Sequence, residues 1–98
     1  MLIKHYSKTG RFCRVTFKLP PDVQALEATL CGDFNNWDVA CQIMQPLKGG
    51  GFSTTLSLAV GRDYRFRYRL DGKRWENDWD ADGYVPNEFG SDDSLLRL

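Results

Sequence analysis

The turns and loops of this chain hold several large aromatic residues, which are the strongest candidates for chemistry. Trp37 lies in the run Cys31–Asp38, whose Gly, Asp and Asn residues predict a tight surface turn. Trp75 follows a second turn sequence, Asp71-Gly72. An aromatic ring matches the apolar C–H face of a sugar, and fixed polar side chains match its hydroxyl groups. The residue types therefore predict a carbohydrate platform, with rings that cover an end of the core as the alternative.

A row of arginines is the second candidate feature. In the range 64–70, Arg65, Arg67 and Arg69 alternate with apolar residues, so they share one face of a predicted strand. Their planar donors suit an acidic or polyhydroxyl ligand. The alternative is a solvated strand face whose aliphatic stems cover apolar surface, and the pattern alone favours this alternative.

The acidic loop Asp78–Gly83 begins like a calcium-binding loop, with carboxylates at positions one, three and five and a glycine at position six. Its twelfth position is Phe89 instead of a bidentate glutamate, so we interpret it as a solvated acidic loop and expect no metal. Trp79 and Tyr84 are expected to fold back over an end of the core. The chain has a single histidine, His5, and its pattern indicates no pair of carboxylates in a buried pocket. We therefore expect no catalytic residues, no cofactor and no enzymatic activity.

Composition narrows the possible partners. A chain of 98 residues predicts one domain, and 13 basic residues balance 13 acidic ones. This balance argues against nucleic acid as a partner, and no apolar run is long enough to cross a membrane. The three cysteines form no C-x-x-C pair, and unpaired thiols fit a cytoplasmic location.

Apolar residues alternate with polar ones through most of the chain, which predicts short strands. Turn signals between them indicate an all-β fold, an antiparallel β-sandwich of six to eight short strands. We expect an N-terminal arm at 1–10, a sandwich domain at 11–98 and a long polar loop at 77–90. The expected strands are 11–19, 27–32, 43–47, 52–58, 64–70 and 94–98.

Several of these motifs together resemble one known family. They are, in order, Gly32–Trp37, Gly51–Leu56, Tyr64–Tyr68, Asp71-Gly72 and Asn87–Gly90. The pattern resembles the glycogen-binding domains of carbohydrate-binding module family 48, which include the β-subunit domain of AMP-activated protein kinase and the N-terminal early-set domains of isoamylases. The resemblance implies an immunoglobulin-like, early-set sandwich that binds α-1,4-linked glucan, such as glycogen or starch, without catalysis.

The resemblance also implies roles for individual residues. The indole rings of Trp37 and Trp75 stack on glucose, and Arg67 corresponds to a basic residue that reaches the sugar. Phe89 corresponds to an apolar residue that pushes into the bent glucan. Ser91 matches a hydroxyl residue that contacts sugar hydroxyls, whereas Asp93 replaces an asparagine and so keeps an acceptor but loses the amide donor. The alternative function is a protein-interaction or regulatory module with a vestigial sugar site, whose partner is a glycan-active enzyme or a kinase.

Overall fold

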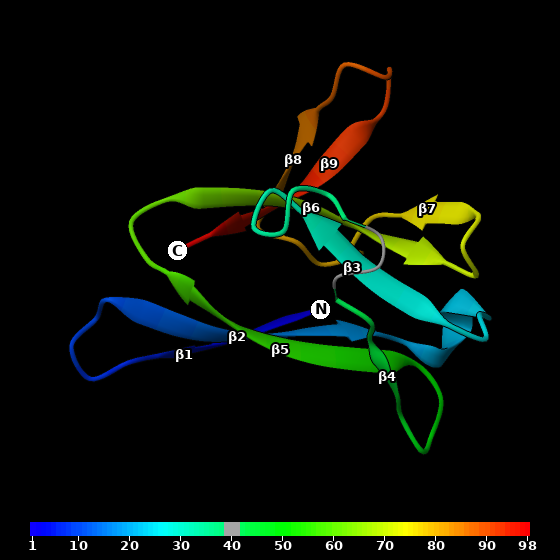
Figure 1. Ribbon diagram of the computed structural model, residues 1–98, viewed down its shortest axis with the longest axis horizontal. Helices are drawn as coiled ribbons and strands as arrows, with labels where there is room; N and C mark the ends of the chain where they lie inside the picture. Colours follow the sequence, from blue (N-terminus) through cyan, green and yellow to red (C-terminus); the bar gives the residue numbers. More distant parts are fainter. Residues whose placement is uncertain (39–41) are drawn as a thin grey trace.

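Two antiparallel β-sheets face each other across one core in the computed structural model, which describes residues 1–38 and 42–98 (Figure 1). One sheet has the order β1-β2-β5-β4, formed by Leu2–Tyr6, Phe12–Leu19, Phe52–Ala59 and Gln45–Pro46. The other has the order β3-β6-β9-β8, formed by Ala28–Gly32, Asp63–Leu70, Asp92–Arg97 and Gly83–Pro86, and β7 (Arg74–Glu76) pairs with β6. The predicted immunoglobulin-like sandwich is confirmed. Its described residues form nine strands, because β1, β7 and β8 join the six ranges expected.

The core lies between the sheets because alternate residues of each long strand point inward. In β2 and β6, every second residue is buried, and Phe17 of β2 meets Phe66 of β6 edge to face at 5.2 Å between ring centroids. Such a pair combines area burial with a favourable ring geometry. The opposite face of β6 therefore carries its arginines outward, as the alternation predicts.

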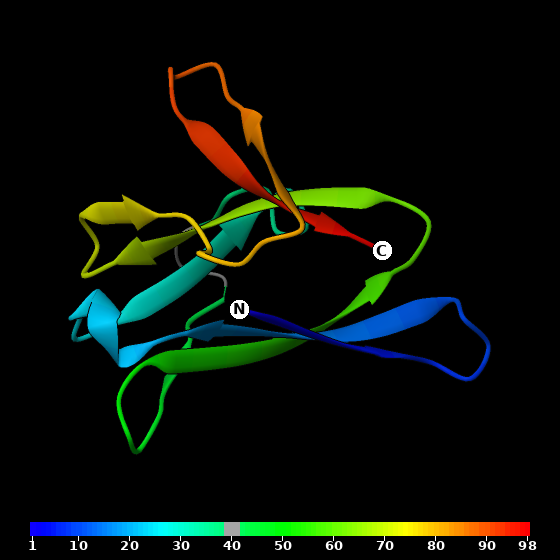
Figure 2. The ribbon, with the colours of Figure 1, turned by 180° about the vertical axis from the view of Figure 1, so that it is seen from behind.

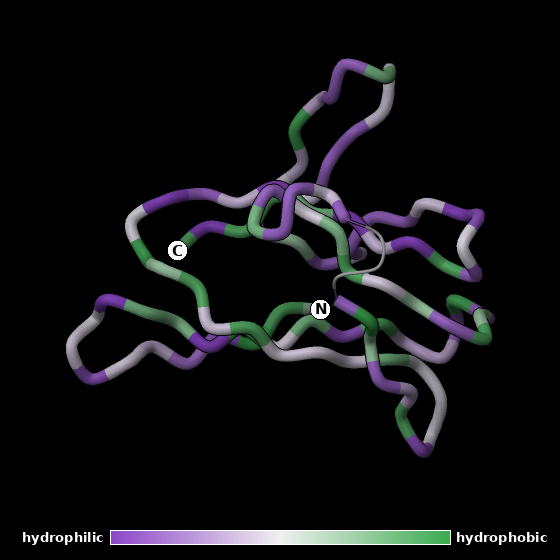
Figure 3. Tube along the Cα trace, in the orientation of Figure 1, coloured by the Kyte–Doolittle hydropathy of each residue, from purple (hydrophilic) through white to green (hydrophobic). Residues whose placement is uncertain are grey.

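The polar loop expected at 77–90 is wrong in part, because Gly83–Pro86 forms β8 and pairs with β9. Pro86 lies at the end of this edge strand, where a missing N–H is tolerated. Strands β8 and β9 form one edge of the second sheet, and the tip of their hairpin projects beyond the rest of the sandwich, as the front and back views show (Figures 1 and 2). The trace of this tip is mostly hydrophilic (Figure 3), so the tip extends into solvent, whereas Leu95 and Leu96 of β9 are buried.

The first residues also join the sandwich. All five residues of β1 pair with β2, from Leu2 opposite Phe17 to Tyr6 opposite Cys13. The strand expected at 43–47 is shortened to β4, while Ile43 forms a single bridge with Thr29 of β3. The described residues contain only the short 3-10 turn η1 (Pro21–Val23) as helix, and no helix there is long and apolar enough to cross a membrane.

Asp78 corrects the interpretation of the 78–83 segment as a solvated loop. Its side chain is buried, accepts a 2.6 Å hydrogen bond from the Tyr68 hydroxyl and pairs at 2.7 Å with the Met1 ammonium group. Burial, followed by the nearby Asp78 charge, raises the pKa of Tyr68 well above its usual value. Asp78 is thus part of the packing between the sheets, and the described residues hold no cluster of three or more potential metal ligands.

Candidate functional site: an aromatic and arginine groove

A groove of about 910 Å³ lies over the outer face of the second sheet, between the Trp37 turn, β6, β7 and the projecting hairpin. Its lining residues are Trp37, Arg65, Arg67, Trp75, Pro86, Asn87, Glu88, Phe89 and Asp93. Five of the six residues predicted to bind sugar are in this set. The sixth, Ser91, lies beside it, where its hydroxyl is 3.4 Å from Nη1 of Arg67.

The turn that carries Trp37 is unusually constrained. Asn36 and Trp37 have φ angles of 55° and 59°, a left-handed conformation that is uncommon for residues other than glycine. The Asn35 side chain holds the turn closed, because it accepts a hydrogen bond from the Gly32 amide and donates one to the Leu30 carbonyl. The Trp37 amide also donates to the Gly32 carbonyl at 2.8 Å.

This turn separates the roles of its two aromatic residues. Phe34 packs toward the core, 5.9 Å from the Phe17 ring centroid, whereas Trp37 is only partly buried and lines the groove. Backbone conformations of this kind persist where surrounding contacts over-determine them, and they cluster at functional sites. The turn prediction is therefore confirmed in its geometry, and the Trp37 ring belongs to the groove wall.

Trp75 forms the second aromatic wall. On β7 it pairs with Arg69 of β6, and its side chain remains 39% exposed. The guanidinium carbons of Arg67 and Arg69 lie 5.8 and 5.6 Å from its ring centroid, within the range of cation–π attraction. The ring is thus held by two cations while part of it stays open to solvent.

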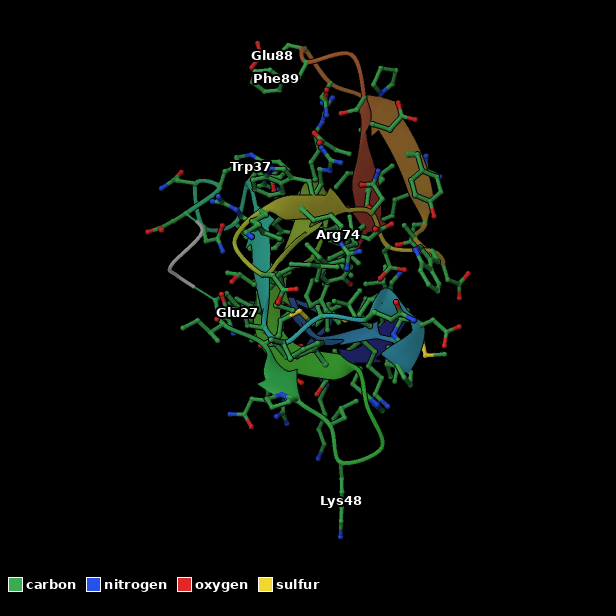
Figure 4. The ribbon with its side chains drawn as sticks, turned by 90° about the vertical axis from the view of Figure 1, so that its right-hand side faces the viewer. Glu27, Trp37, Lys48, Arg74, Glu88 and Phe89 are labelled. Carbon is green, nitrogen blue, oxygen red and sulfur yellow. The ribbon has the colours of Figure 1, made fainter. Side chains whose placement is uncertain are left out.

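Asn87 organises the tip of the hairpin. Its Oδ1 accepts hydrogen bonds from the backbone amides of Phe89 and Ser91, and its Nδ2 donates to Ser91 Oγ and to Asp93 Oδ1. This network leaves the Phe89 side chain 85% exposed. Figure 4 shows Glu88 and Phe89 at the end of the hairpin, beyond the Trp37 ring.

Asp93 lies deeper than a simple sugar contact would require. Only 6% of the residue is exposed, and its Oδ2 pairs with Nη1 of Arg65 at 3.9 Å while Oδ1 accepts from Asn87. The carboxylate is therefore engaged from two sides by the protein itself. It joins β9 to the outer face of β6 at one side and to the hairpin tip at the other.

Four lining residues were not among the six predicted to bind sugar: Arg65, Pro86, Asn87 and Glu88. Of these, Arg65 belonged to the predicted arginine row, because it shares a strand face with Arg67. Trp79 and Tyr84 were expected to fold back over an end of the core, and about half of each residue is exposed. The Tyr84 hydroxyl donates a hydrogen bond to the Asp78 carbonyl.

Cys31 occupies the β3 position paired with Arg67, and its side chain is buried. Burial raises the pKa of its thiol, which the charge of Arg69 only partly opposes. A thiol with a raised pKa is a poor nucleophile because little thiolate is present. The Cys31 thiol therefore does not supply a reactive group under the groove. Cys41, the third cysteine, lies outside the described residues.

A β-sandwich whose outer sheet face carries two partly exposed indole rings and a row of arginines has the surface of a sugar-binding module. The family comparison agrees: the sequence model of carbohydrate-binding module 48 (isoamylase N-terminal domain) matches residues 22–85. The chain belongs to this family. The match includes Trp37, Arg67 and Trp75 and ends before Phe89, Ser91 and Asp93. A search of curated proteins found no match.

Proposed function

We propose that this protein binds α-1,4-linked glucan of the glycogen or starch type and does so without catalysis. The observation that carries the proposal is that Trp37, Arg67 and Trp75, from three separate elements, line one open groove. Stacking on indole rings buries the apolar faces of glucose units, and the arginine donors hydrogen-bond to their hydroxyls.

In this proposal each residue has a distinct role. Trp37 and Trp75 form the stacking platform, and Arg67 donates to sugar hydroxyls with the Ser91 hydroxyl beside it. Phe89, held outward at the hairpin tip, fills the concave side of a curved glucan. Asp93 edges the groove with its carboxylate and also holds Arg65 in place.

The groove's acidic groups favour binding over hydrolysis. Glycoside hydrolysis requires two carboxyl groups that face each other across the scissile bond, one acting as acid and the other as base or nucleophile. Here Asp93 is paired with Arg65, and Glu88 lies on the exposed hairpin tip.

We also propose a cytoplasmic location, because Cys13 and Cys31 are free thiols.

Calorimetry and tryptophan fluorescence with maltoheptaose and β-cyclodextrin test this function. We expect saturable binding that Trp37→Ala abolishes while the thermal unfolding transition is retained. Trp79→Ala is the matched control, because Trp79 is an exposed tryptophan outside the groove lining, and it should bind as the parent does. No heat at millimolar oligosaccharide, together with flow-through on a glycogen column, would contradict the proposal and favour a protein-interaction module.

A further inference from the structure

The arginine row has a charge imbalance that neutral glucan does not explain. Arg65 has Asp93 as its ion-pair partner. The remaining ion pairs within residues 1–38 and 42–98 join other groups, so Arg67 and Arg69 have no carboxylate within 4.0 Å there. Two positive charges therefore stand side by side on the outer face of β6 without an acidic partner from the described chain.

The hydrogen bonds of these two arginines are also incomplete. The Nε atoms of Arg67 and Arg69 are buried and have no hydrogen-bond partner. Arg67 makes a long 3.4 Å contact to Ser91 Oγ, and Arg69 donates to the Gly72 carbonyl at 2.7 Å. Partly buried cations that lack a counter-charge are costly to desolvate, so an anionic ligand at this position would offset that cost.

The Trp75 ring places these charges beside the sugar. Both guanidinium carbons lie within 6 Å of the centroid of the ring on which a glucose unit would stack. Arg67 lines the groove itself, and Arg69 follows it on the same face of β6, so a substituent on that glucose would lie near their donors. The planar fork of arginine matches the oxygens of a phosphate, and a phosphate monoester carries between about −1.5 and −2 charges near pH 7.

We propose that Arg67 and Arg69 bind a phosphate monoester carried by the glucan, so that the groove prefers phosphorylated α-glucan to the neutral chain. This inference rests on the proposed glucan binding. Two cations against a near-divalent anion give charge complementarity that a hydroxyl group does not. Glu88, the other acidic lining residue, lies at the hairpin tip beside Phe89 (Figure 4) and is not in an ion pair with either arginine.

Paired titrations test the preference. Maltooligosaccharides of equal length, with and without a 6-phosphate, are compared by calorimetry at low and high salt. We expect the phosphorylated chain to bind roughly tenfold more tightly at low salt, with a smaller ratio at high salt because the contact is partly exposed. Inorganic phosphate and glucose 6-phosphate should bind far more weakly, since neither spans the two tryptophans. Inorganic phosphate binding as tightly as the phosphorylated chain would overturn the inference.

A matched pair of variants tests whether the arginines of β6 cause the preference for the phosphorylated chain. Arg69→Gln should lower the ratio of phosphorylated to neutral affinity toward one. Arg14→Gln removes the same charge from the exposed outer face of the first sheet and should leave the ratio unchanged. Equal affinities of the parent protein for the two chains would overturn the phosphate preference and leave the proposed function standing. Absence of binding to either chain would overturn both.

Discussion

The side-chain amide of Asn87 donates a 3.1 Å hydrogen bond to the carboxylate of Asp93 and so joins the tip of the β8–β9 hairpin to the start of β9. Through the other oxygen of that carboxylate, the tip is connected to Arg65 on β6. The exposed tip of a projecting hairpin would otherwise be among the least stable parts of the sandwich. The Asn87–Asp93 contact is therefore the link that holds Phe89 and Ser91 over the groove.

Replacement of Asn87 by alanine should lower glucan affinity roughly tenfold, because the tip loses the hydrogen bonds of this side chain to Phe89, Ser91 and Asp93. Global stability should fall by only about 1 kcal/mol, since the hairpin is solvent-exposed. Calorimetry measures the first quantity, and hydrogen exchange of the Phe89 and Ser91 amides reports the loss of order. Asn77→Ala is the control, because Asn77 bonds to Asp92 and Ser94 outside the groove lining and should change stability without changing affinity. Unaltered exchange at the tip in Asn87→Ala would show that other contacts order it.

Gly32→Ala should destabilise the protein by about 1–3 kcal/mol through overpacking. A Cβ at Gly32 would lie 2.6 Å from the Arg65 carbonyl oxygen and 2.7 Å from the Phe34 ring, and neither the backbone nor the packed ring can yield easily. Because the same glycine closes the Trp37 turn, glucan affinity should fall with stability. Urea unfolding measures the change. Gly49→Ala has no atom within 4 Å of its new Cβ and should be nearly neutral; equal behaviour of the two variants would argue against the steric explanation.

The alternation of apolar and polar residues along the chain predicted which side chains of the long strands point into the core. The inward set of β6, including Phe66 and Tyr68, is buried as expected, and its outward arginines follow. The Trp37 turn was also readable, because Gly32 and Asn35 are the residue types that such a turn needs. These features depend on residues close together in the sequence.

The remaining features depend on contacts between distant segments. Asp78 is buried because Tyr68 and the Met1 ammonium group meet it, and no local pattern around residue 78 indicates that. Strand β8 exists through its register with β9, and the Arg65–Asp93 pair requires β6 and β9 to be neighbours. The sequence therefore predicted Asp93 as a candidate site residue but did not predict that Arg65 and Asn87 engage its carboxylate.

Acid should weaken the anchoring of the β6–β7 turn through Asp71. Backbone amides of Glu27 and Leu26 donate to its carboxylate and lower the pKa of Asp71 from its usual value. The pKa of Asp71 in the folded protein lies below its value of about 3.9 in the unfolded chain. The stability that the ionised carboxylate contributes is therefore fully present above about pH 3.9 and is lost as the pH falls through the folded pKa. Urea midpoints between neutral pH and pH 2 measure it. Asp71→Asn should remove part of the loss of stability at low pH. If the urea midpoint of this variant fell with pH as steeply as that of the parent protein, Asp71 would not be the responsible group.

Phe89→Ala should separate folding from binding more cleanly than any other substitution in the groove. With 85% of the residue exposed, the ring contributes little to the core, so stability should change by less than about 0.5 kcal/mol. If the ring fills the inner side of a curved glucan, β-cyclodextrin and maltoheptaose should lose more than about 1 kcal/mol of binding free energy, whereas maltotriose, too short to curve around it, should lose less. Calorimetry with the three ligands gives the comparison. Leu26→Ala, at an apolar position that is 95% exposed outside the groove lining, is the control and should leave all three affinities unchanged. A uniform loss across the three ligands would show that Phe89 acts as a general apolar contact and does not sense glucan curvature.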